Sequence, residues 1–310
     1  MEYLIPIMAA AVRSGTPILF ATLGELLTER VGVMNLGLEG IMLMGSLSGF
    51  WGALVFSNPW AGIALAVLVG MALSALHAVL CVSLGANQVV SGLALAMFGT
   101  GTSALLGKNL VGVTIPGLPA APLPGLAELP WVGPILFSHD VLVYGGFILT
   151  AFLAWFLYFT RGGLNLRAAG EAPRVVDAAG LSAVRLRYLY TILGGGLVGL
   201  GGAYMSVVYT KMWAEMMTAG RGWIALALVI FGLWHPVRSA LGAYFFGGVG
   251  ALQLRMQAGG TTVPAPLLMM LPYVMTIAVL FVIAVRKGYA VSLGAPRSLG
   301  VPYHREERDG

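Results

Sequence analysis

Two polar side chains, Asn35 and Glu39, lie at the start of a long stretch of the sequence that has no other charged residue. They are four residues apart, so a helix that began there would carry both on one face. Amide and carboxylate groups at membrane depth are costly, which makes them default candidates for a polar-solute pathway. The alternative is a capping or interfacial role near the cytoplasmic edge. We therefore treat both as candidate substrate-pathway residues.

Asn87, Gln88 and Ser91 open a second such stretch and are candidates for the same pathway, with a simple loop turn as the alternative for the first two. Four aromatic residues could stack on a planar ligand, although aromatic belts at membrane interfaces explain them equally well. They are Tyr204, Trp213, Trp223 and Trp234.

The segment Arg161–Arg187 is rich in charge, whereas the runs before and after it (141–160 and 188–210) have none. Each run is long enough to cross a bilayer as a helix, at about 1.5 Å per residue over about 30 Å of hydrocarbon. A polar loop between two spans must lie in water, and an excess of arginine predicts the cytoplasmic side. Its arginines are Arg161, Arg167, Arg174, Arg185 and Arg187.

This loop also carries the signals of a helix of about two turns. Pro173 suits the first helical position, the helix can continue to Ala179, and Gly180 suits the residue after its end. Val175, Val176 and Ala179 would share a face, so the helix would offer a small apolar patch to a partner. The alternative is an ordinary basic loop that only fixes topology.

Motifs for several other chemistries are absent. There is no GxxxxGK[ST] nucleotide loop, no HExxH and no cysteine–histidine spacing typical of metal sites. His77, His139, His235 and His304 are scattered, and the single cysteine excludes an internal disulfide. Charge is missing from most apolar runs, which argues against a proton- or sodium-driven carrier and less firmly against an ion channel. These observations favour a pathway for a neutral polar solute moved by energy supplied elsewhere.

The composition indicates an all-α, polytopic transmembrane helical bundle. Of 310 residues, 58% are hydrophobic and 9% are charged, where about 25% charged is usual in soluble domains. The apolar runs are continuous rather than alternating, which disfavours a β-barrel. No cleavable signal peptide is evident. Clustered glycines favour close helix packing, with a moving gate as the alternative.

We expect a single transmembrane domain of residues 1–310 with about eight to ten spans, one of them short or broken. The predicted segments are 4–27, 35–56, 60–84, 88–107, 141–160, 188–209, 222–234, 239–257 and 265–285. Residues 108–140, with six prolines, form a predicted external loop, and 286–310 a cytoplasmic tail. This alternation places the N-terminus outside and the C-terminus inside, in agreement with the excess of Lys and Arg in the cytoplasmic segments.

Five stretches, in this order, resemble one family of membrane proteins. They are GELLTERVGVMNLGLEGIMLMG (24–45), GANQVVSGLAL (85–95), TRGGLNLRAAGEAPRVVDAAGLSAVRLRY (160–188), TAGRGWIALALVIFGLWHP (218–236) and MLPYVMTIAVL (270–280). They are similar to the permease subunits of nucleoside-type ABC importers, within the larger group that includes simple-sugar and branched-chain amino-acid permeases. The resemblance covers nearly the whole chain.

The resemblance implies a non-enzymatic transport subunit in a bacterial or archaeal cytoplasmic membrane. Its implied partners are ABC ATPase subunits, a second permease that is similar but distinct, and an extracytoplasmic substrate-binding lipoprotein. ATP and Mg would be bound by the ATPase, and no cofactor or metal by this chain. The solute would be a nucleoside. A simple sugar or a riboflavin-like solute is the alternative, followed by an ATP-independent facilitator and, more remotely, an intramembrane enzyme.

The resemblance also identifies the arginine-rich loop as the segment that couples to the ATPase. The implied coupling residues are Arg167, Gly170, Glu171, Arg174, Asp177 and Gly180. The loop departs from the pattern of many other ABC importers, in which a glycine follows Glu-Ala-Ala after three residues. Here Gly180 lies nine positions beyond Glu171.

Overall fold

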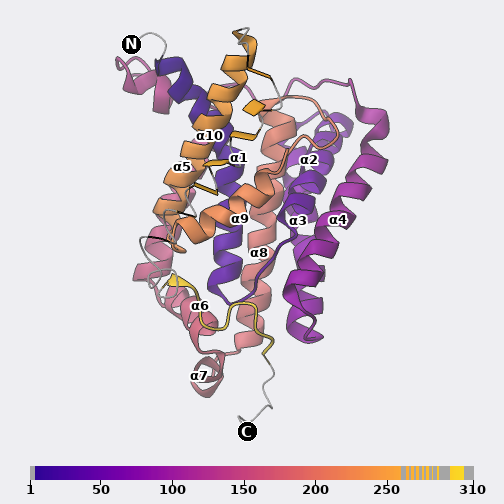
Figure 1. Cartoon of the computed structure of the whole chain (residues 1–310), viewed down its shortest axis with the longest axis vertical. Coiled ribbons are helices and arrows are strands. Elements are labelled where there is room, and N and C mark those ends of the chain that lie inside the picture. The colour runs from indigo at the N-terminus through magenta and orange to yellow at the C-terminus, as the bar shows by residue number, and fades with distance from the viewer. Residues whose placement is uncertain are drawn as a thin grey trace.

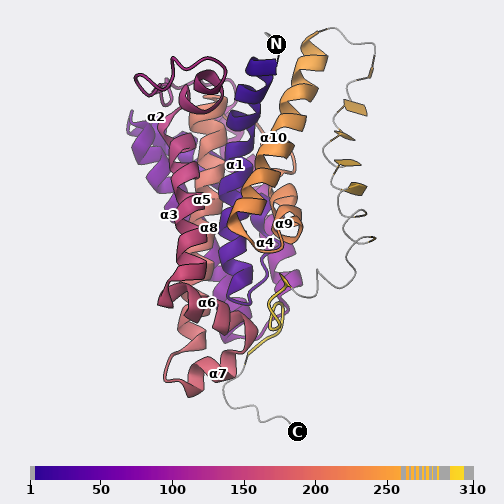
Figure 2. The ribbon, with the colours of Figure 1, turned by 90° about the vertical axis from the view of Figure 1, so that its left-hand side faces the viewer.

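A computed structural model describes residues 4–259, 263, 264, 267, 268, 270, 271, 274, 275, 277, 278, 281, 285 and 294–303. The described chain is a bundle of long helices (Figures 1 and 2). Helix α1 begins at one end of the bundle, whereas α6, α7 and residues 294–303 lie at the other. The predicted span 265–285 and the rest of the predicted tail lie largely outside the described residues.

Apart from α6, the helices match the predicted segments closely. They are α1 (Leu4–Arg30), α2 (Leu38–Val55), α3 (Pro59–Ala78), α4 (Gln88–Gly107), α5 (Val141–Phe159), α6 (Arg161–Glu171), α7 (Pro173–Ala178), α8 (Ala183–Ala203), α9 (Arg221–Phe231) and α10 (Pro236–Ala258). Short π-helical turns extend α3 to Ser83 and α8 to Tyr209. Among the described residues, α1, α2, extended α3, α4, α5 and extended α8 are long and apolar enough to cross a bilayer. The polytopic all-α bundle is confirmed.

Side-chain caps explain where several helices begin. Asn58 accepts a hydrogen bond from the backbone N–H of Trp60, and Pro59 occupies the first helical position of α3. Asp140 accepts two backbone N–H bonds at the start of α5. Such caps satisfy amide groups that the helix itself cannot pair.

Helix α8 lies at the centre and packs closely because its glycines leave room for neighbouring backbones. A Cβ atom on Gly194 would lie 2.5 Å from the carbonyl oxygen of Gly24 in α1, and one on Gly202 would lie 2.1 Å from that of Met42 in α2. On a third face, Gly199 meets α3. Small residues that let helices approach closely favour association within a bilayer, so the packing interpretation of these glycines is confirmed.

Replacing Gly199 by alanine is expected to destabilise the bundle. The added Cβ would lie 2.3 Å from the carbonyl oxygen of Ala66, and overpacking of this kind costs about 1–3 kcal/mol or more. Gly145→Ala in α5 is the matched control, because nothing lies within 4 Å of its added Cβ; it should be neutral or stabilising by up to about 1 kcal/mol. Thermal unfolding of both purified variants measures the difference. Equal stability of Gly199→Ala and the unmodified chain would contradict the packing.

The proline-rich segment 108–140 forms a cap over one end of the bundle. It contains a 3-10 turn (Lys108–Leu110) and a π-helical turn (Gly133–Phe137), with mostly irregular chain between them. Ile115 and Leu118 pack into the same buried cluster as Trp213. The segment is irregular over most of its length, and its assignment as an external loop stays a prediction.

Helix α6 was not predicted, since the sequence analysis recognised only one short helix in the arginine-rich loop. Its sequence contains Gly162, Gly163 and Gly170, which weaken a helical signal. Packing compensates: Leu166 is fully buried, and a Cβ on Gly163 would lie 2.0 Å from the carbonyl oxygen of Phe156 in α5. Glycine here permits contact between α6 and the end of α5.

Candidate functional site

The chain is not helical between α1 and α2. Residues 31–37 run without helical structure before α2 begins at Leu38. The prediction that Asn35 and Glu39 share a helix face is therefore wrong, because Asn35 lies in this irregular segment and only Glu39 lies in α2. Non-helical backbone at membrane depth is tolerated where it is buried in protein or lines a cavity.

Side chains from three helices hold this segment. Glu25 of α1 accepts the backbone N–H of Asn35 at 2.9 Å, and Gln88 of α4 accepts that of Met34 at 2.7 Å. His77 Nε2 lies 3.0 Å from the carbonyl oxygen of Met34. This carbonyl belongs to the same peptide group as the Asn35 N–H that Glu25 accepts, so both sides of that peptide are held. These bonds replace the helical ladder and fix the point at which α2 begins.

The second irregular segment comprises residues 210–220, between the extended α8 and α9, and it contacts the cap. Met212 pairs with Thr114 of the cap, whereas Trp234, just after α9, contacts the end of α1 through Glu29. The connection therefore extends along much of the bundle, although α9 has only 11 residues and spans about 16 Å. This is the short or broken span predicted for residues 222–234.

Helix α9 is held at both ends by buried glutamates from other helices. At its start, Glu39 Oε1 accepts the hydroxyl of Thr218 (2.5 Å) and the N–H of Gly220 (2.8 Å), and Oε2 accepts the N–H of Gly222 (2.7 Å). Gly220 caps α9 with a positive φ of 78° but has no side chain to offer. Glu39 therefore supplies the missing acceptors, at the end where a helix dipole favours a carboxylate.

The far end of α9 is fixed by a second carboxylate. Trp234 Nε1 donates to Glu29 Oε2 at 2.5 Å, and the Trp234 carbonyl accepts a bond from Arg30 Nε at 3.0 Å. Trp234 and Glu29 are both nearly inaccessible to solvent. Because burying these polar groups is favourable only when they are paired, the two glutamates fix α9 against α1 and α2.

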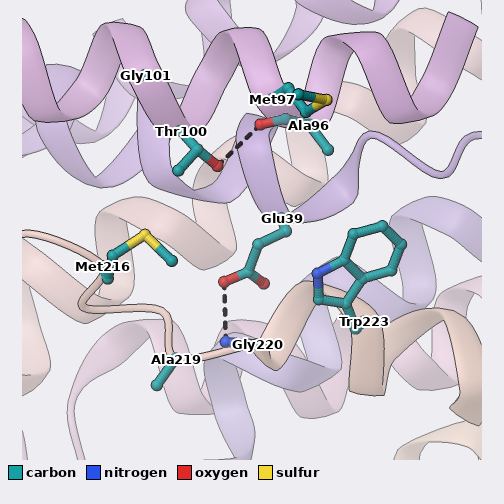
Figure 3. Close-up of a pocket in the computed structure, with 9 residues that line it drawn as sticks. All are labelled: Glu39, Ala96, Met97, Thr100, Gly101, Met216, Ala219, Gly220 and Trp223. Atoms are coloured by element: carbon teal, nitrogen blue, oxygen red, sulfur yellow. Dashed lines mark hydrogen bonds between the residues drawn. The ribbon is translucent and has the colours of Figure 1, made fainter.

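A cavity of about 670 Å³ lies beside the start of α9. Figure 3 shows Glu39 between the 216–220 segment and the indole of Trp223, with Met97 and Thr100 of α4 opposite. The lining is mainly apolar, with one carboxylate and one hydroxyl side chain. Such a site can hold a solute that has a flat apolar face and a few polar groups.

The structure separates the other predicted pathway residues from this cavity. Asn87 caps α4 by accepting the N–H groups of Val89 and Val90, and Ser91 bonds to His77. Of the five predicted pathway side chains, only Glu39 is among the residues that line the cavity. The pathway role of Asn35, Asn87, Gln88 and Ser91 stays a prediction, and each has a structural hydrogen bond.

Of the four aromatic candidates, Trp223 lines the cavity, whereas Tyr204, Trp213 and Trp234 are buried in packing. Sequence reasoning missed Glu25 and Glu29 as determinants of the site. The available signal was an acidic residue within a span-length apolar run, because buried carboxylates in a bilayer are rare without a role.

Several predicted coupling residues make contacts within the chain. Gly170 packs against the Arg30 carbonyl, and Glu171 Oε2 accepts the N–H of Arg297 at 3.3 Å. Arg167 lies over the ring of Tyr158, 5.2 Å from its centre. These contacts position α6; whether the residues also couple to an ATPase stays a prediction.

The predicted short helix is confirmed as α7. It begins at Pro173, and Gly180 follows its end with a φ of 83°. The predicted apolar patch is divided, because Val176 is only 3% exposed and packs inward, whereas Val175 is 65% exposed. Val175 and the exposed Ala179 form the outward face.

Known proteins similar to the chain include membrane transport subunits. Residues 7–280 match the profile of the family described as branched-chain amino acid transport system / permease component. A Haloferax volcanii protein, provisionally named glucose ABC transporter permease protein TsgC13, is 42% identical over 83% of this chain and 80% of its own length. The Lactococcus lactis nucleoside ABC transporter permease protein NupC is 34% identical, over 87% and 90%.

The Bacillus subtilis guanosine ABC transporter permease protein NupQ is 31% identical, over 89% of this chain and 91% of its own length. The range that the family profile matches, residues 7–280, includes both irregular segments and the α6–α7 region. No solved structure has a significant match to the chain.

Proposed function

The chain belongs to the family of branched-chain amino acid transport system permease components and is a multi-pass ABC transporter permease. From this premise we propose that Glu39 and α9 form part of its pathway for a nucleoside. The observation that supports this pathway is the cavity at the start of α9. There a buried carboxylate, a hydroxyl and an indole meet beside a break in the helical structure.

The composition of the cavity supports a nucleoside as the solute. Trp223 offers a flat surface for a planar base, and Met97 and Met216 offer polarisable apolar contacts. The Thr100 hydroxyl donates to the Ala96 carbonyl at 2.8 Å, and its oxygen can still accept a hydrogen bond from a polar edge of the solute. The printed functions of NupC and NupQ agree with this choice, whereas that of TsgC13 supports a simple sugar as the second candidate.

We further propose that transport is driven by an ATPase that is a separate chain and binds ATP and Mg. The absence of a nucleotide loop from the sequence supports this division. The cavity is lined by Met97, Met216 and Trp223, which are all exposed, and these apolar side chains support closure by a second, similar permease. An extracytoplasmic binding lipoprotein would deliver the solute. The assembly would lie in a cytoplasmic membrane, with α7 on the cytoplasmic side.

Proteoliposomes test this proposal. With the ATPase, the second permease and the binding protein present, vesicles are expected to accumulate labelled guanosine only when ATP reaches the ATPase, and vesicles with this chain alone should not. Excess unlabelled uridine should compete, whereas glucose and riboflavin should not. Competition by glucose would instead support a simple sugar as the transported solute. Free passage of guanosine through the chain alone would establish a facilitator instead.

A further inference from the structure

Residues 294–303, here named the tail strap, lie across the end of the bundle that carries α6 and α7 (Figure 2). The strap is far in sequence from every element it contacts. Its hydrogen bonds and packing contacts join it to α1, α6, α7, α8 and the turn after α9. A short segment that reaches so many elements can position them relative to one another.

One end of the strap holds α7. The Tyr303 hydroxyl donates to Asp177 Oδ2 at 2.6 Å. Asp177 Oδ1 meanwhile accepts the N–H of Ala183 at 3.0 Å, which ties α7 to the start of α8. Helix α7 has six residues, and a helix this short is not stable without such contacts.

The middle of the strap is fixed by a buried arginine of α8. Arg187, 1% exposed, donates to the Ser298 hydroxyl (3.0 Å) and to the Val301 carbonyl (3.3 Å), and its guanidinium lies 5.6 Å from the centre of the Tyr303 ring. Ser298 also donates its backbone N–H to the Gly170 carbonyl of α6 at 2.9 Å. A buried guanidinium without these partners would be costly, so the strap supplies acceptors that Arg187 needs at this position.

The other end of the strap reaches the turn after α9. Gly294 packs against Leu233 and the ring of Trp234, and its carbonyl accepts a bond from Arg30 at 3.4 Å. Arg30 also bonds to the Trp234 carbonyl. The strap therefore contacts the same tryptophan that Glu29 holds at the end of α9.

We propose that the tail strap connects α7 mechanically to α9, with Tyr303 and Arg187 as the positioning residues. Helix α7 belongs to the arginine-rich loop that is expected to couple to the ATPase, so the relevance of this connection to transport rests on the proposed function. The connection itself is a property of this chain. It provides a continuous set of contacts from Asp177, through Ser298 and Gly294, to Trp234 and the helix beside the cavity.

Hydrogen exchange on the purified full-length chain in lipid nanodiscs, without an ATPase, tests the connection. Tyr303→Phe removes the hydroxyl bond to Asp177 while the ring beneath Arg187 remains. Because a hydrogen bond to a charged group contributes about tenfold or more to a local equilibrium, we expect exchange in α7 to rise about tenfold. Exchange in the last turn of α9 and at Trp234 should rise about two- to threefold.

Tyr188→Phe is the matched control. Its hydroxyl bonds to Ser83 rather than to the strap, and it should leave exchange in α7 and α9 unchanged. Faster exchange in α7 alone would overturn the connection and leave only a local anchor, and no change in either helix would overturn both. Because no ATPase is present, these outcomes do not depend on whether α7 binds one.

Discussion

Replacing Glu39 by glutamine is expected to reduce uptake by at least tenfold. The carboxylate accepts three hydrogen bonds at the start of α9, from Thr218, Gly220 and Gly222. A glutamine has one acceptor oxygen, so its amide would direct N–H groups at a backbone N–H that is already a donor. Leaving such a buried donor unpaired costs about 1–3 kcal/mol, which is enough to shift α9 away from the position that shapes the cavity. Uptake of labelled guanosine by the complete transporter measures the effect.

Glu128→Gln is the control for this change, because it removes an exposed acid from the cap and surface substitutions of this kind stay within about 0.5 kcal/mol. Thermal unfolding of the purified Glu39→Gln chain separates a local change at α9 from loss of the fold. Undiminished uptake by Glu39→Gln would show that the attachment of α9 to α2 is not needed for transport. The position of the pathway would then have to be sought elsewhere.

The sequence predicted α7 well because its boundaries depend on local backbone chemistry. Proline lacks an N–H and suits a helix start, and glycine adopts the left-handed conformation after a helix end. Both signals act within a few residues of the helix, and Pro173 and Gly180 occupy the predicted positions. The direction in which Val176 points was not predictable, because it depends on how α7 packs against the core.

The break before α2 could not be predicted because distant side chains maintain it. The local signals in residues 31–37 are limited to two glycines and to the Asn35 side chain, which accepts the N–H of Gly37. The other acceptors that stabilise the irregular chain are Glu25 and Gln88. The site at α9 likewise combines Glu39 with residues about 180 positions away. Hydropathy located the broken span because its apolar run is short, but the pairing of Glu39 with Gly220 is a tertiary contact without a local signal.

Replacing Val175 by glutamate is expected to abolish ATP-driven uptake, a loss of at least tenfold, while the fold of the isolated chain is retained. The side chain is 65% exposed on the outward face of α7, so the substitution should change the stability of the chain by no more than about 0.5 kcal/mol. In a complex with an ATPase the same face would be covered. A buried, unpaired carboxylate there would cost several kcal/mol of binding. Guanosine uptake, ATPase co-purification and thermal unfolding measure the three effects.

Leu84→Glu provides the comparison for Val175→Glu. Leu84 is 69% exposed, and its neighbour Ser83 contacts Tyr188 near the start of α8, so both substitutions add a carboxylate toward the same end of the bundle. Only the one on α7 should release the ATPase, because a general effect of negative charge at this end would affect both variants equally. Retention of the ATPase and of uptake by Val175→Glu would exclude α7 as the docking helix. Loss of both with an intact fold would assign coupling to a helix of six residues, whose position depends on the tail strap.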